Sequence, residues 1–112
     1  MDTLETEILK KPQGLVMSIR GEIGIVQVET LTKQFLSLLE GKPTLVVLDL
    51  SDLAFIASAA MGAMIALRRD LGKVGGNVRL AAIKPQVKEA LKRALFERIF
   101  QMYDTVDAAL VA

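Results

Sequence analysis

The chain has 112 residues and a nearly balanced charge, with 14 Lys and Arg against 13 Asp and Glu, and it contains neither cysteine nor histidine. These absences exclude disulfides, thiol nucleophiles and thiolate metal sites, and they remove the commonest general base and metal ligand. The formal charge of +1 lacks the basic excess of a nucleic-acid-binding protein, and the 52% hydrophobic content excludes a disordered chain. We therefore expect one domain over residues 1–112, with an aliphatic core, no metal, no cofactor and no nucleic-acid partner.

The start of the chain is acidic and polar, without the basic and apolar stretches of a signal peptide. The longest stretch of low polarity, residues 53–67, is shorter than the about 20 apolar residues that a membrane span needs. We expect a soluble, cytoplasmic protein without membrane insertion.

The first part of the chain predicts a β-hairpin. Residues 3–11 alternate weakly and predict a short edge strand, the Pro12-Gln13-Gly14 segment is a turn signal, and residues 15–20 predict a second strand. Gly21 then interrupts the pattern, and residues 23–28 fit either a strand or a helix.

A helix follows the hairpin, and Gly41 and Pro43 end it. The apolar side chains on its shared face are Val28, Leu31, Phe35, Leu38 and Leu39. Residues 44–50 are a nearly continuous apolar run, which is typical of a central parallel strand covered by helices. Residues 51–56 lead into a second helix over residues 59–74, and Gly75-Gly76 ends it.

The last part predicts a further strand, a helix, a short strand and a terminal helix. Residues 77–83 form the strand, and Pro85 starts the third helix because its missing N–H costs nothing in a first turn. The apolar stripe of that helix is Val87, Leu91, Ala94 and Leu95. Residues 99–102 predict the short strand, and Asp104-Thr105 can cap a helix that ends at Val111.

The predicted order is therefore β-β-α-β-α-β-α-β-α, which is an α/β fold. Repeated β-α-β units imply parallel strands joined by right-handed crossovers, while the opening hairpin makes the sheet mixed. We expect a mostly parallel sheet of four or five strands with about four helices.

Ser58 is the main candidate for a functional residue. It lies just past the carboxyl end of the central strand, and functional sites of open α/β sheets gather at the carboxyl ends of strands. Small residues surround it, namely Ala57, Ala59, Ala60 and Gly62. One interpretation is that Ser58 caps the second helix. The other is that it accepts a phosphate, which would bond the N–H groups of Ala60 and Met61 at the helix N-terminus.

Several segments, in their order and spacing, together carry a resemblance to a known family. They are 20–22 (Arg-Gly-Glu), 46–51 (Val-Val-Leu-Asp-Leu-Ser), 66–69 (Ala-Leu-Arg-Arg), 75–80 (Gly-Gly-Asn-Val-Arg-Leu), the 84–87 helix start (Lys-Pro-Gln-Val), 99–100 (Ile-Phe) and 103–110 (Tyr-Asp-Thr-Val-Asp-Ala-Ala-Leu). The chain resembles the STAS domain, and more narrowly the stand-alone anti-sigma factor antagonists of bacteria. The resemblance runs from Leu15 to Ala109 and implies a single STAS-like domain.

The resemblance also implies a function in transcription regulation by partner switching. In that family the loop after the central strand reads Asp-Ser-Ser-Gly or Asp-Ser-Ala-Gly, and an anti-sigma factor that is also a serine protein kinase phosphorylates its first serine. Phosphorylation breaks the complex with the anti-sigma factor, and a phosphatase restores the unmodified antagonist. The acceptor serine of this motif falls on Ser58.

The chain departs from the family motif beside Ser58. The acidic residue before the acceptor serine is Ala57 here. After the serine, Ala59 stands at the Ser or Ala position of the motif, and Ala60 stands at its glycine. The family also often has an Asp two residues beyond the glutamate of the Gly-Glu turn, and Gly24 stands at that position. These departures weaken the expectation that a kinase recognises Ser58 efficiently. The partner-binding surface that the resemblance implies comprises Ala57, Ser58, Ala59, Ala60, Met61 and Gly62, with Gly21, Glu22, Ile23 and Gly24 beside them.

Two other functions stay open as alternatives. The first is a non-switching STAS subunit of a larger complex, such as a stress-signalling assembly or a lipid-transport system. The second is an enzyme, which the residues disfavour, because Ser58 with Asp49 and Asp52 lacks a base of suitable pKa. We expect no catalytic activity, and either a monomer or a weak dimer.

Overall fold

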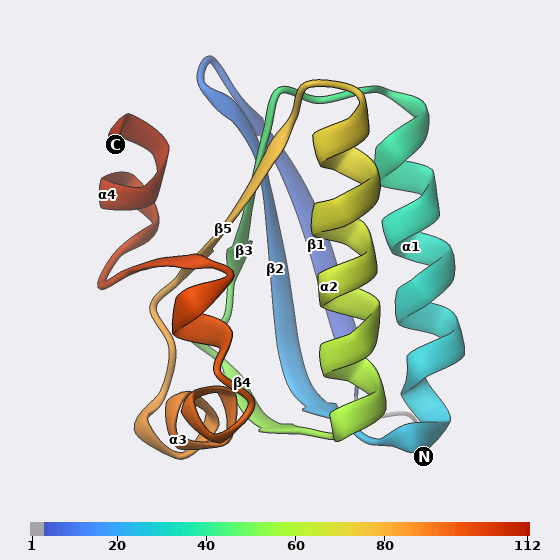
Figure 1. Ribbon diagram of the computed structural model, residues 1–112, viewed down its shortest axis with the longest axis vertical. Helices are drawn as coiled ribbons and strands as arrows, with labels where there is room; N and C mark the ends of the chain where they lie inside the picture. Colours follow the sequence, from blue (N-terminus) through green and yellow to red (C-terminus); the bar gives the residue numbers. More distant parts are fainter. Residues whose placement is uncertain (1–3) are drawn as a thin grey trace.

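A mixed sheet forms the centre of the computed structural model, which describes residues 4–112. The elements in chain order are β1 (Leu4–Lys11), β2 (Gly14–Ile23), the 3₁₀ turn η1 (Ile25–Gln27), α1 (Val28–Glu40), β3 (Leu45–Asp49), β4 (Leu53–Ile56), α2 (Ser58–Lys73), β5 (Asn77–Ala81), α3 (Pro85–Arg93), the 3₁₀ turn η2 (Phe96–Arg98), β6 (Gln101–Tyr103) and α4 (Val106–Val111). The strands lie in the order β1-β2-β3-β5-β6, and β4 pairs with β2 (Figure 1). Only β1 and β2 are antiparallel, and the other pairs are parallel.

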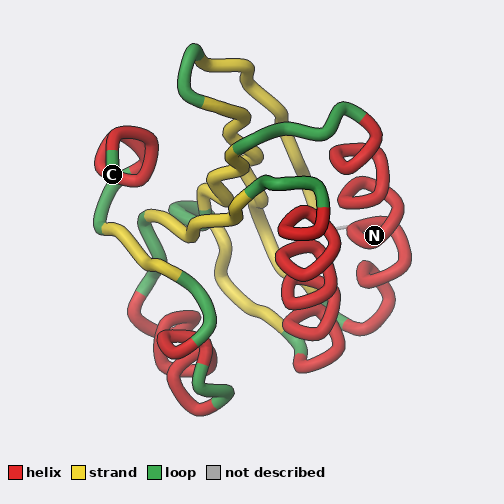
Figure 2. The backbone as a smooth tube through the Cα atoms, turned by 45° about the horizontal axis from the view of Figure 1, so that its top comes forward, coloured by secondary structure: helices red, strands yellow, loops and turns green. Residues whose placement is uncertain are grey.

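The helices cover the two faces of the sheet unequally (Figure 2). Apolar side chains of α1, α2 and α3 pack with one sheet face in a large core cluster, which includes Met17, Leu48 and Leu80. The smaller cluster on the other face joins Val16 and Val47 of the sheet to residues of α4. Elsewhere this second face carries polar side chains of β1 and β2, such as Glu7, Ser18 and Arg20.

The α/β class, the mostly parallel sheet and the predicted helices are confirmed, but the expected strand number was too low. The described residues form six strands, because residues 53–56 form β4 and do not simply lead into the second helix. Both end residues of β4, Leu53 and Ile56, are buried, while Ala54 and Phe55 between them are exposed. The four residues of β4 are all apolar, and so short an apolar run does not by itself distinguish a strand from a segment that leads into a helix.

Several boundaries also differ from the prediction. β2 continues past Gly21, which has a φ of 93°, and pairs with β4 after a register shift at this point. Leu95 lies outside α3 with a φ of 61°, and both it and Ala94 are exposed, so neither belongs to the buried stripe of that helix. The part of the first predicted strand at Thr3 lies outside the described residues.

The terminal helix is capped as the sequence suggested. Thr105 precedes α4, and its hydroxyl oxygen accepts a hydrogen bond of 3.0 Å from the amide of Ala108. Within residues 4–112, no helix has the length and apolar character needed to cross a membrane.

Candidate functional site

Ser58 is the first residue of α2, and its side chain is exposed at the start of that helix. The capping position belongs to Ala57, which has extended backbone angles of φ −80° and ψ 155°. The Ser58 hydroxyl makes no hydrogen bond to the part of the chain that the structure describes. The interpretation of Ser58 as a helix cap is therefore wrong, and the hydroxyl is free to react or to contact a partner.

The free amides at this helix N-terminus are not the two that the sequence suggested. The amides of Ala60 and Met61 donate to the carbonyl oxygen of Ala57, at 3.0 Å and 3.3 Å. Among residues 4–112, the amides of Ser58 and Ala59 have no protein acceptor. Any anion held by this end of α2 would therefore bond Ser58 and Ala59, where the positive end of the helix dipole also lies.

The structure brings the loop that follows β2 next to Ser58. The amide of Ala57 donates to the carbonyl oxygen of Ile23 over 2.8 Å, and Ile23 lies opposite Ile56 in the parallel pair of β2 and β4. Gly21 is held from the other side, because its amide donates to the carbonyl oxygen of Asp52 over 2.9 Å. The two predicted parts of the surface, residues 21–24 and residues 57–62, are therefore neighbours.

Two exposed apolar residues extend this surface, and sequence reasoning missed them. Ile25 and Val26 in η1 are 76% and 81% exposed. The turn that presents them is held by Gln27, whose side-chain oxygen accepts a hydrogen bond of 2.9 Å from the amide of Gly24. The sequence did contain one signal for them. These two β-branched residues lie just before α1, and they do not belong to the apolar stripe that begins at Val28.

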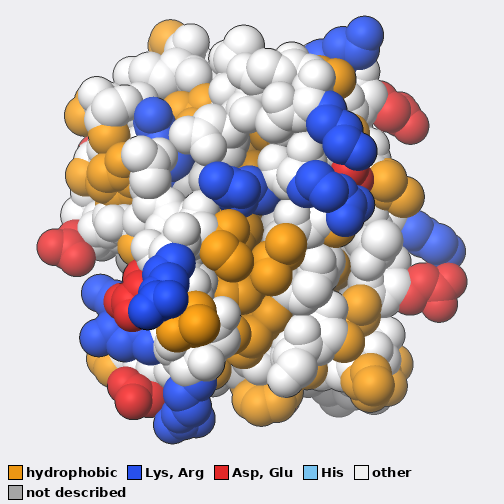
Figure 3. Space-filling model, viewed as in Figure 1, with side chains coloured by type: hydrophobic (Ala, Val, Ile, Leu, Met, Phe, Trp, Pro, Cys, Tyr) orange, Lys and Arg blue, Asp and Glu red, His pale blue; other side chains and the backbone are white. Residues whose placement is uncertain are grey.

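A shallow groove borders Ser58 on the side of α3. Its volume is about 610 Å³, and its lining residues are Phe55, Ile56, Ala57, Ser58, Met61, Ala90, Arg93 and Ala94. Phe55 is 51% exposed although it is aromatic. Hydrophobic side chains are visible in the hollow between α2 and α3, with basic side chains at its margin (Figure 3). The surface around Ser58 is thus mainly apolar.

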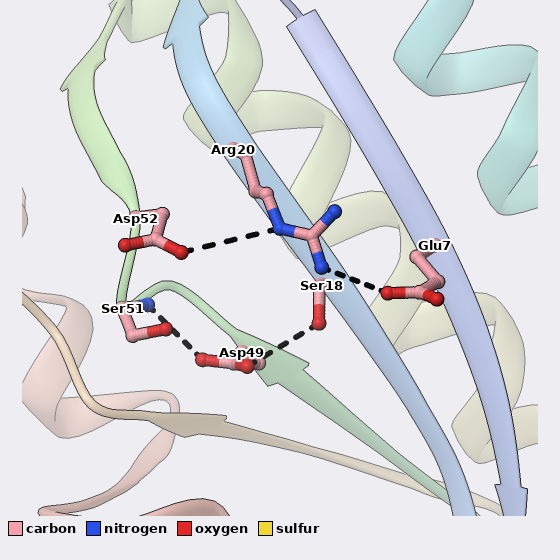
Figure 4. A network of polar contacts seen from close by, with 6 residues as sticks. All are labelled: Glu7, Ser18, Arg20, Asp49, Ser51 and Asp52. Carbon is pink, nitrogen blue, oxygen red and sulfur yellow. Dashed lines mark hydrogen bonds and ion pairs between the residues drawn. The ribbon is translucent and has the colours of Figure 1, made fainter.

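A polar network on the open sheet face fixes the loop between β3 and β4 (Figure 4). Asp49 accepts hydrogen bonds from the Ser51 amide at 3.0 Å and from the Ser18 hydroxyl at 3.3 Å. Arg20 donates to Glu7 at 2.8 Å and lies 4.0 Å from Asp52. None of these contacts involves Ser58, and the two aspartates instead hold the turn between β3 and β4.

The charge of Arg20 is favoured in this network. The hydrogen bond to Glu7 raises the pKa of Arg20 above its ordinary value, and the nearby carboxylates of Asp52 and Glu5 act in the same direction. Arg20 therefore links β1, β2 and the loop before β4 as a permanent cation.

Comparisons with known proteins agree with this architecture. A sequence model of the STAS domain matches residues 5–109. The Bordetella bronchiseptica protein BtrV, whose name assigns it to the anti-sigma factor antagonists, is 28% identical over 98 residues, which are 88% of this chain and 84% of that protein. The crystal structure of an anti-sigma factor antagonist from Mycobacterium paratuberculosis has a TM-score of 0.87 and 26% identity, covering 96% of this chain and 91% of that one.

The fold is also shared with the anti-sigma factor antagonist SpoIIAA. Its unphosphorylated form has a TM-score of 0.80 and 18% identity, covering 95% of this chain and 93% of that one. Its phosphorylated form, from Bacillus, has a TM-score of 0.72 and 19% identity, covering 96% of each chain. At this identity the likeness shows a common fold.

Proposed function

This chain belongs to the STAS domain family, and from that premise we propose that it is an anti-sigma factor antagonist switched by phosphorylation of Ser58. The unmodified protein binds an anti-sigma factor that is also a serine kinase, through residues 57–62 and the adjoining residues 21–24. Phosphorylation of Ser58 releases that partner, and a phosphatase reverses the change. The observation that carries the proposal is the exposed, unbonded hydroxyl of Ser58 at the start of α2.

The surroundings of Ser58 support a docking role. Ala59 and Gly62 on the first turns of α2 are exposed and small, so a partner backbone can approach the helix closely. Ile25, Val26 and Phe55 provide exposed apolar area within the same surface. Burial of such side chains is the main favourable term in protein association, at about 25 cal/mol per Å² of apolar surface.

The same surroundings explain why a phosphate would reverse binding. A phosphoserine carries about −1.5 to −2 charges at neutral pH and three strongly hydrated oxygens. The fold tolerates this charge because the amides of Ser58 and Ala59 are free to bond it. A partner that buries the apolar surface around Ser58 would have to remove water from the phosphate, which is costly without a compensating cation.

The test is to incubate the protein with Mg-ATP and an extract of its native host and to map any added phosphate by mass spectrometry. We expect one phosphate at Ser58 and none in Ser58→Ala. Ser51→Ala is the matched control, because Ser51 is also an exposed serine after the central strand and its loss leaves the proposed acceptor intact. Phosphate on Ser51, or equal labelling of Ser58→Ala, would contradict the switch.

A second candidate function is a constitutive STAS subunit of a larger assembly, and a specific observation favours it. Ile25 and Val26 are more than three-quarters exposed beside the site, and permanent interfaces are more apolar than transient ones. Ala57, in place of the acidic residue of the switching motif, points the same way.

Partner capture from host extract with Ser58→Glu and Ser58→Gln separates the two functions. The two side chains are similar in size and differ in charge. A switched antagonist loses its partner in Ser58→Glu and keeps most of it in Ser58→Gln. A constitutive subunit keeps the same partner in both variants.

A further inference from the structure

β1 is an open edge of the sheet. Among the strands that the structure describes, it pairs with β2 alone. Residues 7–11 of β1 are all exposed, and they include Ile8 and Leu9, which are 47% and 44% exposed. An edge of this length with unpaired backbone groups is a template for another strand.

The charges of β1 are divided between its two ends. Glu5 and Glu7 lie in the first half, and Lys10 and Lys11 lie in the second half. Two copies of the strand side by side in parallel would place like charges opposite each other, which is unfavourable. Two copies in antiparallel orientation bring the acidic end of one beside the basic end of the other.

We propose that β1 pairs antiparallel with β1 of a second copy of this chain, so that the two sheets join into one. The inference goes beyond the proposed function, because it concerns an edge that the switching mechanism does not use. A two-fold axis passes through Ile8 in this arrangement. Glu5 then lies opposite Lys11 of the second copy, and the symmetry forms this pair twice.

The alternation of side chains supports this register. Ile8 lies opposite Met17 of β2, on the sheet face that the large core covers, so the two copies of Ile8 meet on that face. Glu5 lies opposite Arg20 on the other face, where Lys11 also points by alternation. The ion pairs and the apolar contact therefore lie on opposite faces of the joined sheet.

Other registers are less favourable. An axis through Glu7 would place two glutamates opposite each other. An axis through Leu9 would shorten the paired segment and would bring Lys11 opposite Glu7, which already accepts a hydrogen bond of 2.8 Å from Arg20. The axis through Ile8 pairs residues 5–11 and uses the charges of Glu5 and Lys11, neither of which forms an ion pair with another described residue.

The dimer leaves the Ser58 surface accessible. The first residues of β1 pair with the end of β2 that leads into residues 21–24, while the hairpin turn lies at the opposite end. Antiparallel pairing therefore sends the Ser58 surfaces of the two copies to opposite ends of the joined sheet. Partner binding and self-association can occur together.

Charge reversal tests the ion pairs. We expect sedimentation equilibrium at low ionic strength to show a reversible dimer whose association constant falls about tenfold or more in Glu5→Lys and in Lys11→Glu. The double variant Glu5→Lys/Lys11→Glu should recover association, because the swapped charges again attract between copies. Lys92→Glu, an exposed charge change on α3, is the control and should leave association unchanged.

Cysteine cross-linking tests the register independently of dimer strength. The chain has no cysteine of its own, so a single introduced thiol reports on one position. Ile8→Cys should form a disulfide dimer rapidly under mild oxidation, because directly opposite residues lie about 4.5–5.5 Å apart between Cα atoms. Thr6→Cys should not, because its two copies would lie about 13 Å apart along the strands.

Three results would overturn the proposal. They are a monomer for the wild type at every concentration tested, single charge reversals without effect on association, or faster cross-linking through Leu9→Cys or Thr6→Cys than through Ile8→Cys. Circular dichroism of each variant confirms that the fold is retained, and the recovery expected of the double variant cannot arise from a general loss of stability.

Discussion

Gln34 of α1 carries the buried side-chain oxygen that has no hydrogen-bond partner among the described residues. A buried polar atom without a partner loses its hydration and gains nothing in return, which costs about 1–3 kcal/mol. Gln34→Leu has a similar volume and removes this cost. We expect it to raise the free energy of unfolding by about 1 kcal/mol, as measured by urea denaturation.

Gln27 is the matched control for this prediction. Its side-chain oxygen accepts a hydrogen bond from the amide of Gly24, so the same exchange removes a formed bond. Gln27→Leu should lower the free energy of unfolding by about 1 kcal/mol. Two changes of equal sign would show that the leucine itself, and not the state of the glutamine oxygen, determines the effect.

Asp70 of α2 gives the protein a pH-dependent contribution to stability. The hydrogen bond from Arg69, at 3.0 Å, lowers the pKa of Asp70 below its ordinary value of 3.8, and the nearby charge of Lys73 adds to this effect. Because the folded-state pKa is depressed, the contribution is present above the unfolded pKa and is lost as the pH falls through the folded value. Asp70→Asn should therefore have a slightly lower melting temperature than wild type at pH 7.

The difference between the two melting temperatures should shrink below about pH 4 and vanish once Asp70 is protonated in both states. Thermal unfolding followed by circular dichroism between pH 2 and pH 7 measures this difference. Asp70 is partly exposed, so solvent screening keeps the effect small. A difference that grows on acidification would mean that the aspartate is destabilising as an anion.

At the scale of the elements, α2 contains two glycines where a methyl group would meet no neighbour. A Cβ atom added at Gly62 or at Gly72 has no atom within 4 Å other than those of its own helix backbone. Glycine in a helix interior costs about 0.5–1 kcal/mol relative to alanine. Gly62→Ala and Gly72→Ala should therefore each raise the free energy of unfolding, by up to about 1 kcal/mol.

These two variants should differ in binding. Gly62 lies in the proposed partner surface one turn after Ser58, whereas Gly72 lies at the far end of the helix. Partner capture from host extract should weaken in Gly62→Ala and stay at the wild-type level in Gly72→Ala. Equal binding by both variants would show that the partner does not approach α2 at Gly62.

The helices and strands also show how much of the fold could be predicted from the sequence. The continuous apolar run of β3 and the helical spacing of α1 each have one strong periodicity, and both were predicted with nearly correct bounds. β4 was missed because its pairing depends on β2, which continues past Gly21 and turns toward it through a register shift. That dependence is tertiary, so no local pattern of residues 53–56 could indicate it.

The candidate site was predictable to a similar degree. The sequence placed Ser58 at the start of α2, the family resemblance implied that residues 21–24 lie beside it, and the structure agrees on both positions. It could not assign the cap to Ala57, because alanine has no capping side chain and only its extended backbone marks the boundary. Ile25 and Val26 were not assigned to the surface, since their exposure depends on the path of η1.

At the scale of the whole molecule, the two faces of the sheet differ in how firmly they are covered. The large cluster unites α1, α2 and α3 with the sheet, whereas α4 is attached mainly through Ala109 and Leu110. One further contact holds it, a hydrogen bond of 2.7 Å from Arg79 to the carbonyl oxygen of Ala109. α4 has six residues, and isolated helices of that length are not stable in water.

We therefore expect α4 to open locally, at a lower free energy than global unfolding. Leu110→Ala removes much of the apolar area that α4 buries. The decrease in the free energy of global unfolding cannot exceed the free energy with which α4 is docked on the sheet. In the wild type, hydrogen exchange should be faster at the α4 amides of Ala109 and Leu110 than at the α2 amides of Leu67 and Leu71, and Leu110→Ala should accelerate the α4 amides further. Met64→Ala, in the large cluster, is the contrasting variant. It should accelerate the α2 amides by lowering global stability about 2–5 kcal/mol, and it should leave the α4 amides unchanged because they exchange through local opening. If Met64→Ala instead accelerated the α2 and α4 amides equally, the two faces of the sheet would unfold as one cooperative unit, and α4 would be as integral to the fold as the helices of the large core.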